Sequence, residues 1–218
     1  MSFQVPGNTV EKSNPISDAH ACMASSMQQI LSHRYSGYAY DTSKPVEEEQ
    51  LKLLIEAASL APSSYNEQPW HFIICDRNRN KEAYEKLLST LVEFNRNWAS
   101  KAPVLILGVA ASNSSHNGKF NRFSQYDTGA ATFSMMLRAT SLGLMAHQMA
   151  GYDEVKAKEL FSIPNGYTPM SVMAIGYRSS EEEQPERKRK SYSENFFLGS
   201  WNNPYCAAAL AKDQTKSK

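Results

Sequence analysis

Hydrophobic residues recur at helical spacing in three stretches of the N-terminal half of the chain. In residues 23–33 the apolar positions fall at i, i+4, i+7 and i+8, which predicts a helix that ends near His33. Residues 45–58 open with a proline and three glutamates, a composition typical of a helix N-terminus, and continue with an apolar face. Residues 80–91 repeat the apolar spacing. We therefore expect each stretch to form a helix that buries one side.

Three runs of apolar and β-branched residues predict strands. They are "WHFIICD" at 70–76, "APVLILGVA" at 102–110 and "PMSVMAIGY" at 169–177. The second run is apolar at nearly every position, so both of its faces must be covered by other elements. We therefore expect it at the centre of the sheet.

A long segment that begins at Ser124 carries small or apolar residues on nearly every side. Ser124 and Asp127 form an S-x-x-D pattern that predicts a capped helix N-terminus, and Gly143 marks the end of the helix. A helix of this kind must be buried, either in a large core or against another subunit. A shorter helix is expected to begin after Asp153 and to reach Phe161.

Helices interleaved with three or four strands predict a three-layer domain of the α+β or α/β class. We expect a polar N-terminal tail over residues 1–15, one domain over 16–190 and a C-terminal extension over 191–218. The extension contains the aromatic residues Phe196, Phe197, Trp201 and Tyr205. Because aromatic side chains beyond the last strand need a surface to pack on, we expect the extension to pack on a second copy of the chain.

The composition limits the classes of partner. The 218 residues include 23 Lys and Arg against 22 Asp and Glu, which offers no basic surface for nucleic acid and favours a small-molecule ligand. No stretch approaches the ~18 consecutive apolar residues of a membrane span, and the N-terminus lacks a signal-peptide pattern. The three cysteines are widely spaced without a C-x-x-C pair. We therefore expect a cytoplasmic protein with no nucleic-acid or membrane partner, in which Cys75 is a buried apolar residue.

The sequence contains none of the common motifs for side-chain catalysis. It lacks G-x-S-x-G, H-E-x-x-H, P-loop and G-x-G-x-x-G patterns, and its five histidines have no metal-ligand spacing. We therefore predict no catalytic side chain and no metal site. Polar residues gather instead in "APSSYNEQPWHF" at 61–72, more than a simple turn needs. A polar surface without an acid, base or nucleophile is typical of an enzyme whose cofactor performs the chemistry.

Two pairs of residues are candidates for binding a phosphate group. Arg34 and Ser36 stand two apart in a turn, where a guanidinium and a hydroxyl can share phosphate oxygens. Arg187 and Arg189 repeat that spacing near the end of the domain. Exposed arginines are also common as solvated surface residues, and the "RKRK" run at 187–190 matches a nuclear-import signal as well.

Taken together, these segments resemble the FMN-dependent nitroreductases. The resemblance rests on "HRYSGYAYD", "APSSYNEQPWHF", "APVLILGVA", "YDTGAATFSMMLRATSLGL", "HQMAGYD" and "MAIGYR", which occur in the order of the family and span roughly residues 25 to 190. The P-S-S-x-N-x-Q-P-W run is the most specific of them. The resemblance implies an α+β fold of three α/β/α layers with a central mixed, mainly antiparallel sheet, in a homodimer with long central helices at its interface.

The resemblance also implies which residues hold FMN. Arg34 and Ser36, together with Arg187 or Arg189, would bind the phosphate, and Pro62, Ser63, Ser64 and Asn66 would contact the isoalloxazine ring across the subunit boundary. The implied cofactor-binding residues are Arg34, Tyr35, Ser36, Tyr38, Pro62, Ser63, Ser64, Asn66, Asn95, Met149, Ala150, Gly151, Arg187 and Arg189.

Four of these residues would lie at the edge of the implied flavin ring. Main-chain N–H groups at Ala150 and Gly151 would face flavin N5 and O4, because small residues allow close approach. Asn95 would contact the ring edge, and His147 is expected to be a packed structural residue. Tyr38 stands where members of the family often carry Lys or Arg, so negative charge on reduced flavin would be stabilised less strongly or by another group.

The implied activity is that of an NADH- or NADPH-dependent oxidoreductase. Hydride would pass from the nicotinamide to FMN and then, in a ping-pong cycle, to a nitroaromatic, a quinone or another electron-poor acceptor. Dehalogenation of iodinated tyrosines is an alternative within the superfamily, but its usual lid motif is not identified in this sequence. A flavin-binding redox sensor or interaction protein without turnover, and a phosphate-ester binder without flavin, are alternatives of other classes.

Overall fold

The computed structural model describes residues 27–181 and 183–206 of the chain. The chain divides into two compact units, residues 1–183 and 184–218. The boundary lies within the charged stretch that precedes the boundary expected at residue 190. None of the helices in the described residues is both long enough and apolar enough to span a membrane.

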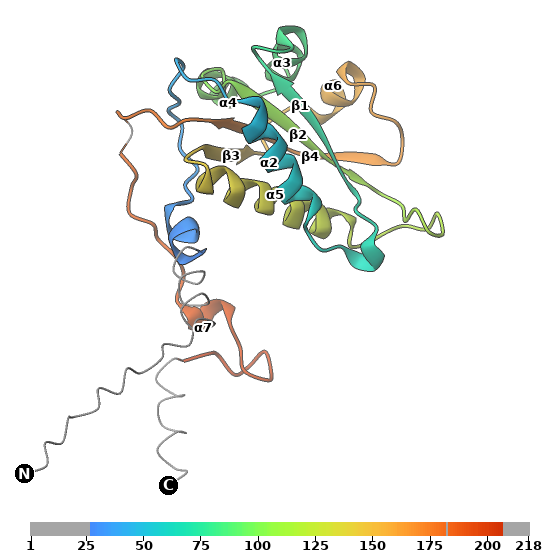
Figure 1. The fold of residues 1–218 in the computed structure, drawn as a ribbon. Coiled ribbons are helices and arrows are strands. Elements are labelled where there is room, and N and C mark those ends of the chain that lie inside the picture. Colours follow the sequence, from blue (N-terminus) through green and yellow to red (C-terminus); the bar gives the residue numbers. More distant parts are fainter. Residues whose placement is uncertain (1–26, 182, 207–218) are drawn as a thin grey trace, which may run out of the picture. The chain divides into compact units, whose positions relative to one another are not determined.

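Four antiparallel strands form the sheet of the first unit (Figure 1). They are β1 (Trp70–Asp76), β2 (Val104–Ala111), β3 (Met145–Met149) and β4 (Tyr167–Gly176), in the order β1-β2-β4-β3. β2 lies between β1 and β4, which confirms that the most apolar run is central. β3 is an edge strand that the apolar pattern alone does not predict, because His147 and Gln148 interrupt its hydrophobic run.

Helices cover both faces of this sheet, and the fold is α+β in three layers, as the sequence predicts (Figure 1). In the first unit the helices are α2 (Glu48–Ser59), η1 (Ser64–Asn66), α3 (Lys81–Leu88), α4 (Glu93–Ala99), α5 (Ser124–Ser141) and α6 (Glu154–Leu160). A helical segment at 27–33 precedes them and ends at His33, as expected. Its apolar residues Met27 and Leu31 are exposed at 49% and 38%, so the predicted buried face is not covered within the described residues.

The alternation of side chains along β2 builds the two halves of the core. Leu105 and Leu107 point into a cluster with α3, α4 and α6, whereas Val104 and Ile106 point into a cluster with α2 and α5. All four side chains are at most 1% exposed. Both layers of helices are therefore required by the composition of this one strand.

The helix expected over residues 80–91 ends early, as α3 at Leu88, and α4 follows beyond the expected range. Asn80 caps α3 by accepting a hydrogen bond from the Ala83 N–H at 3.0 Å. The chain then leaves the helix because its backbone pairs with a distant turn: the Asp153 N–H donates to the Thr90 carbonyl at 2.7 Å, and the Val92 N–H donates to the Gly151 carbonyl at 3.0 Å. This pairing fixes the start of α4 beside residues 151–153.

The capping pattern expected at the start of α5 is wrong. Phe123 occupies the N-cap position without a side-chain cap, and Ser124 lies inside the helix. The Ser124 hydroxyl donates to the Ala111 carbonyl at the end of β2, and the Asp127 carboxylate accepts a hydrogen bond from the Ser64 N–H at 2.9 Å. Both side chains serve tertiary contacts, which is why the local pattern misleads. α5 also exposes Phe133 at 43%, so one side of this apolar helix is not covered in the single chain.

The second unit contains a small aromatic cluster of its own. α7 (Tyr192–Asn195) begins with a reciprocal hydrogen-bonded pair of Ser191 and Glu194. Phe197 stacks on Trp201 with ring centroids 4.7 Å apart, and Tyr192 contacts Tyr205 at 6.3 Å. The aromatic residues of the extension thus pack partly on one another, although Trp201 remains 80% exposed.

Truncation of Leu54 tests the packing of α2 on the sheet. Leu54 is fully buried, whereas Leu60, just beyond the same helix, is 78% exposed. We expect Leu54→Ala to lower the free energy of unfolding by about 2–5 kcal/mol, because it removes contacts and leaves a cavity. The matched Leu60→Ala change should stay within about 0.5 kcal/mol of the parent. Urea denaturation followed by circular dichroism measures both, and equal midpoints for the two variants would contradict the packing described.

Candidate functional site

The polar segment 61–72 forms a strained turn between α2 and β1. Tyr65, Asn66 and Gln68 have φ of 54°, 56° and 47°, values in the left-handed region that residues other than glycine rarely adopt. Such conformations cost on the order of 1–3 kcal/mol each, and they persist only where the surroundings enforce them. Strain of this kind concentrates at functional sites, so this turn is the first candidate.

Hydrogen bonds within the segment enforce part of this conformation. The Gln68 N–H donates to the Ser63 hydroxyl at 2.9 Å, and the Gln68 side-chain amide donates to the Asn66 carbonyl at 3.1 Å. Trp70 begins β1 and packs against the core cluster of α2 and α5. Gln68 and Trp70 therefore support the turn, while Pro62 and Asn66 remain exposed on it.

Glu67 links the turn to the loop that connects β2 with α5. Its carboxylate accepts hydrogen bonds from the Ser114 hydroxyl, from the Ser115 N–H and hydroxyl at 2.8 and 2.7 Å, and from the His116 N–H at 3.3 Å. These donors, the Ser114 hydroxyl first, lower the pKa of Glu67 to about 2. Sequence reasoning missed Glu67, because its partners lie far along the chain in a loop without a recognisable motif.

Arg34 and Ser36 project to one side of their turn, as their spacing predicts. The Arg34 guanidinium donates to the Ser36 hydroxyl at 3.1 Å, and both residues are half-buried. Tyr35, between them, packs against the core cluster of α3, α4 and α6. A guanidinium and a hydroxyl held together in this way can bind the oxygens of a phosphate group.

An aromatic cluster follows this loop. Tyr38 contacts the rings of Trp98 and His147 edge-on, with centroids 5.3 and 5.0 Å apart, and His147 stacks on Trp98 at 4.5 Å. Tyr38 and Trp98 also line an open pocket of about 500 Å³ together with Phe94. The Trp98 Nε1 is buried and has no hydrogen-bond partner in the described structure. His147 is thus a packed residue, as expected, and it shares a hydrogen bond of 2.8 Å with the Gly37 carbonyl.

Asn95 and Gly151 are in direct contact. The Asn95 side-chain amide donates to the Gly151 carbonyl at 3.0 Å, and a Cβ at Gly151 would lie 2.6 Å from the Asn95 nitrogen. Position 151 therefore has no room for a side chain. Among the described residues no hydrogen bond is donated by the N–H groups of Ala150 or Gly151 to another part of the protein. Met149 is only 5% exposed, so its side chain belongs to the core and only its main chain could face a ligand.

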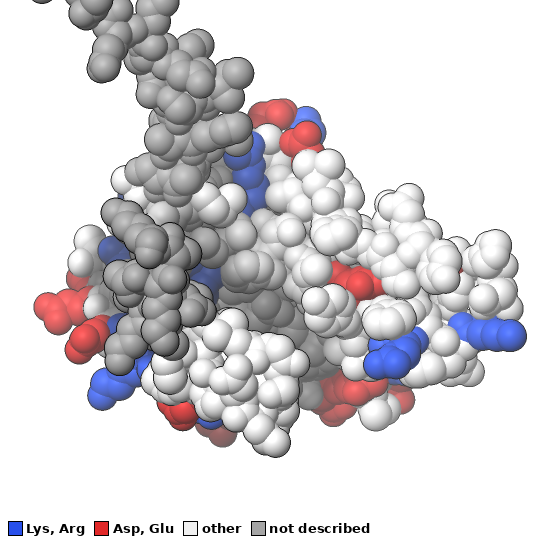
Figure 2. Space-filling view, turned by 90° about the horizontal axis from the view of Figure 1, so that it is seen from below, with Lys and Arg blue, Asp and Glu red and all other residues white. Residues whose placement is uncertain are grey.

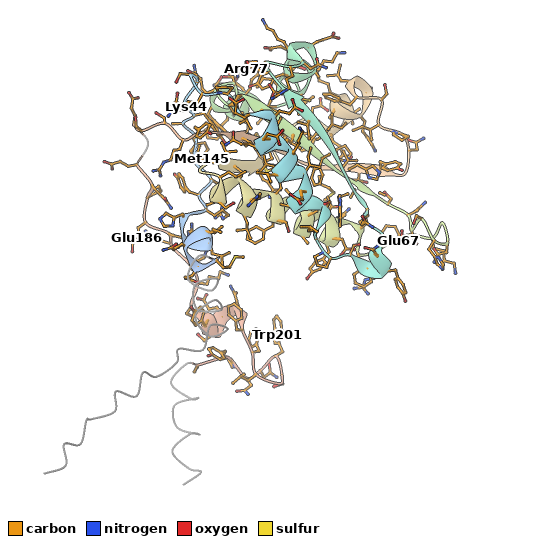
Figure 3. The ribbon with its side chains drawn as sticks, viewed as in Figure 1. Lys44, Glu67, Arg77, Met145, Glu186 and Trp201 are labelled. Atoms are coloured by element: carbon orange, nitrogen blue, oxygen red, sulfur yellow. The ribbon has the colours of Figure 1, made fainter. Side chains whose placement is uncertain are left out.

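The predicted site residues of the first unit fall into two groups toward opposite ends of α5. Ser64 holds the strained turn to Asp127, in the first turn of α5, whereas Gly37 holds the Arg34 loop to β3, which follows the other end of that helix. α5 has 18 residues and is therefore about 27 Å long. Figure 3 shows Glu67 and Met145 toward these opposite ends. In one chain the two groups are held apart by much of this helix.

Arg187 and Arg189 lie in the second unit and are exposed. The Arg189 guanidinium donates to the Lys188 carbonyl at 2.8 Å. Their proposed part in phosphate binding stays a prediction from the sequence.

The remaining candidate groups offer little to catalysis. Burial raises the pKa of the Cys75 thiol to about 12, and the side chain is inaccessible, so Cys75 is the buried apolar residue that the sequence predicts. The described residues contain no cluster of His, Cys, Asp and Glu able to hold a metal ion. On the face shown in Figure 2 basic and acidic side chains are scattered, with a broad area between them that carries neither.

Comparisons with known proteins find relatives of the chain. Proteins named "Putative NADH dehydrogenase/NAD(P)H nitroreductase" from Methanothermobacter thermautotrophicus and Archaeoglobus fulgidus are 35% and 30% identical to the chain. The first match covers 62% of this chain and 68% of the relative, and the second covers 65% and 80%.

Two solved structures share the fold. One is described as an oxidoreductase containing FMN; it superimposes with a TM-score of 0.74 at 27% identity and covers 93% of this chain and 100% of its own. A nitroreductase family protein from Clostridium difficile 630 gives a TM-score of 0.66 at 28% identity and covers 79% and 97%. The sequence model of the Nitroreductase family matches residues 31–177, which is most of the described sheet and helices. The chain therefore belongs to the nitroreductase family.

Proposed function

We propose that the protein is an FMN-dependent NAD(P)H oxidoreductase that reduces nitroaromatics, quinones or similar electron-poor acceptors. The observation that carries the proposal is the turn at Ala150 and Gly151. Its N–H groups donate to no other part of the described protein, and Asn95 occupies the space of a side chain at position 151. Two unengaged main-chain donors on a narrow turn suit the polar edge of a flavin ring. The solved relative described as an oxidoreductase containing FMN supports this choice of cofactor.

The chain's own residues would bind and orient the cofactor. Arg34 and Ser36, already joined by a hydrogen bond, would hold the phosphate through charge-assisted bonds. The open pocket beside Tyr38 and Trp98 would receive the ring. FMN, when bound, supplies the hydride chemistry, so no side chain is needed as acid, base or nucleophile.

We further propose a homodimer in which each flavin site combines both chains. The Arg34 loop and the strained turn lie toward opposite ends of α5, so a symmetric pair would bring the loop of one chain to the turn of the other. The exposed Phe133 on α5 and Trp201 in the second unit are apolar surface that such a partner would cover. Arg187 or Arg189 remains a candidate for binding the phosphate.

The first test is the colour of the purified full-length protein. We expect a yellow protein with about one FMN per chain, and Arg34→Ala should weaken FMN binding by about 1.5–3 kcal/mol, or roughly 10- to 150-fold in Kd. Lys52→Ala, which removes a charge from the exposed face of α2, is the matched control and should leave Kd unchanged. Ultrafiltration with flavin absorbance measures both. A colourless protein that also fails to bind added FMN would refute the proposal.

The second test separates an enzyme from a flavin-binding sensor. Anaerobic NADH or NADPH should bleach the flavin within the time of a stopped-flow experiment, whereas a sensor without turnover would stay yellow. The flavin bound to the Cys75→Ala variant should bleach at a rate within a few-fold of that in the parent. With a pKa of about 12 the Cys75 thiol stays protonated at neutral pH, so it contributes no reactive thiolate. A hundredfold slower reduction in Cys75→Ala with FMN still bound would mean that a catalytic group has been overlooked.

The third test asks whether the two groups of residues act across the dimer. Arg34→Ala and Asn66→Gly chains can be co-expressed with different tags, and the mixed dimers isolated through both tags. Asn66→Gly removes the amide and keeps a residue suited to φ of 56°. If the sites are shared, each mixed dimer has one intact site and should bind about one FMN per two chains at parental affinity. If every site of the mixed dimer instead binds FMN more weakly than the parent, both groups of residues belong to a site within one chain.

A further inference from the structure

Tyr65 is displayed at the tip of the strained turn. Its side chain is 96% exposed, although its backbone lies at φ of 54°, which is unfavourable for a bulky residue. Tyr65, Asn66 and Gln68 account for three of the four non-glycine residues with positive φ in the described part of the chain. Because the ring of Tyr65 contributes almost no packing to its own chain, folding stability does not explain a tyrosine at this position.

Two carboxylates hold the turn. Asp127, only 5% exposed, accepts the Ser64 N–H at 2.9 Å. Glu67 accepts four hydrogen bonds from residues 114–116. Since these donors lower the pKa of Glu67 to about 2, its contribution is complete above the unfolded value of 4.5 and is lost only as the pH falls from there toward 2. The hydrogen bonds of Glu67 therefore hold the turn in place throughout the neutral pH range.

The loop that Glu67 binds is itself ordered. Asn113 and Phe120 form a bridge, the Ser114 N–H donates to the Lys119 carbonyl at 2.8 Å, and Gly118 turns the chain at φ of 68°. This short hairpin gives Glu67 fixed donors. The conformation of Tyr65 is consequently determined by contacts outside its own segment, which is how strain is maintained where it serves a function.

We propose that Tyr65 selects the electron acceptor by stacking on planar aromatic acceptors, and that Glu67 acts through the 113–120 hairpin as the residue that positions it. This inference rests on the proposed function, in which Ser64 and Asn66 contact flavin in the dimer; Tyr65, between them, then lies within side-chain reach of the acceptor. A phenol ring is electron-rich, and it stacks well on the electron-poor ring of a nitroaromatic or quinone. Preorganisation by the two carboxylates lowers the entropy lost on binding.

Acceptor discrimination tests Tyr65 directly. At saturating NADH or NADPH, Tyr65→Gly should raise KM for nitrobenzene and for a benzoquinone about three- to tenfold. The kcat/KM for ferricyanide, which has no aromatic face and takes one electron per molecule, should stay within twofold. Tyr65→Phe should match the parent for all acceptors. Val155→Ala, which shortens an exposed side chain on α6, serves as the control.

Equilibrium binding gives a readout without turnover. Nitrobenzene titrated into the oxidised holoprotein in the absence of NAD(P)H should perturb the flavin absorbance, and Tyr65→Gly should raise its Kd by a factor similar to that in KM. The inference is overturned if Tyr65→Gly lowers kcat/KM equally for all acceptors. It is also overturned if neither Kd nor KM changes while FMN and turnover are retained. In both cases the proposed function stands. Loss of FMN from the parent protein would overturn the proposed function itself.

Glu67 is tested as a positioning residue by a double-mutant cycle. Glu67→Ala should raise KM for the planar acceptors without changing FMN content, and Tyr65→Gly/Glu67→Ala should show no further increase over Tyr65→Gly alone. Glu56→Ala, which removes an exposed carboxylate from α2, is the matched control. Additive increases in KM would mean that Glu67 acts independently of Tyr65, which would overturn its assigned role.

Discussion

Burial of β2 on both faces is the constraint on which the architecture depends. A strand whose first four side chains are at most 1% exposed can exist only between two layers of helices. Leu105 packs into one of these layers and Val104 into the other. β2 also determines where the turn before β1 and the hairpin after β2 come together. The strained turn enters β1 beside the end of β2, and the 113–120 hairpin leaves from that end, so Glu67 meets its partners there.

Much of this architecture is readable from local pattern, and what is not readable has a tertiary cause. Apolar periodicity identifies α2, α3, α5 and the three longest strands, because each buries one or two faces. It does not predict the break between α3 and α4, because that break is made by backbone pairing of Thr90 and Val92 with residues 151–153. Nor does it predict how Ser124 and Asp127 act, since their partners come from β2 and the turn before β1.

The residues of the candidate site are likewise of two kinds, those that the sequence identifies and those that it does not. Arg34, Ser36 and the 61–72 segment are identified by residue type and spacing, and the close approach at Gly151 follows from its lack of a side chain. Glu67, Trp98 and Asp127 are not identified as site residues, because a carboxylate or an indole acquires its role only when the fold supplies a donor or leaves an atom unpartnered. The positive φ of Tyr65 is likewise invisible in the sequence, which has tyrosine where glycine or asparagine is usual.

The way the 113–120 hairpin is attached has an evolutionary consequence. Its cross-strand bonds are internal, and its tie to the strained turn runs through the single carboxylate of Glu67, so little of the core depends on its length or composition. Insertions or replacements in this hairpin can therefore accumulate without unfolding the domain. The hairpin bound to the turn of Tyr65 can thus diversify, whereas substitutions in the layers around β2 would cost core packing. A fold built in this way can acquire new substrates by drift in one loop.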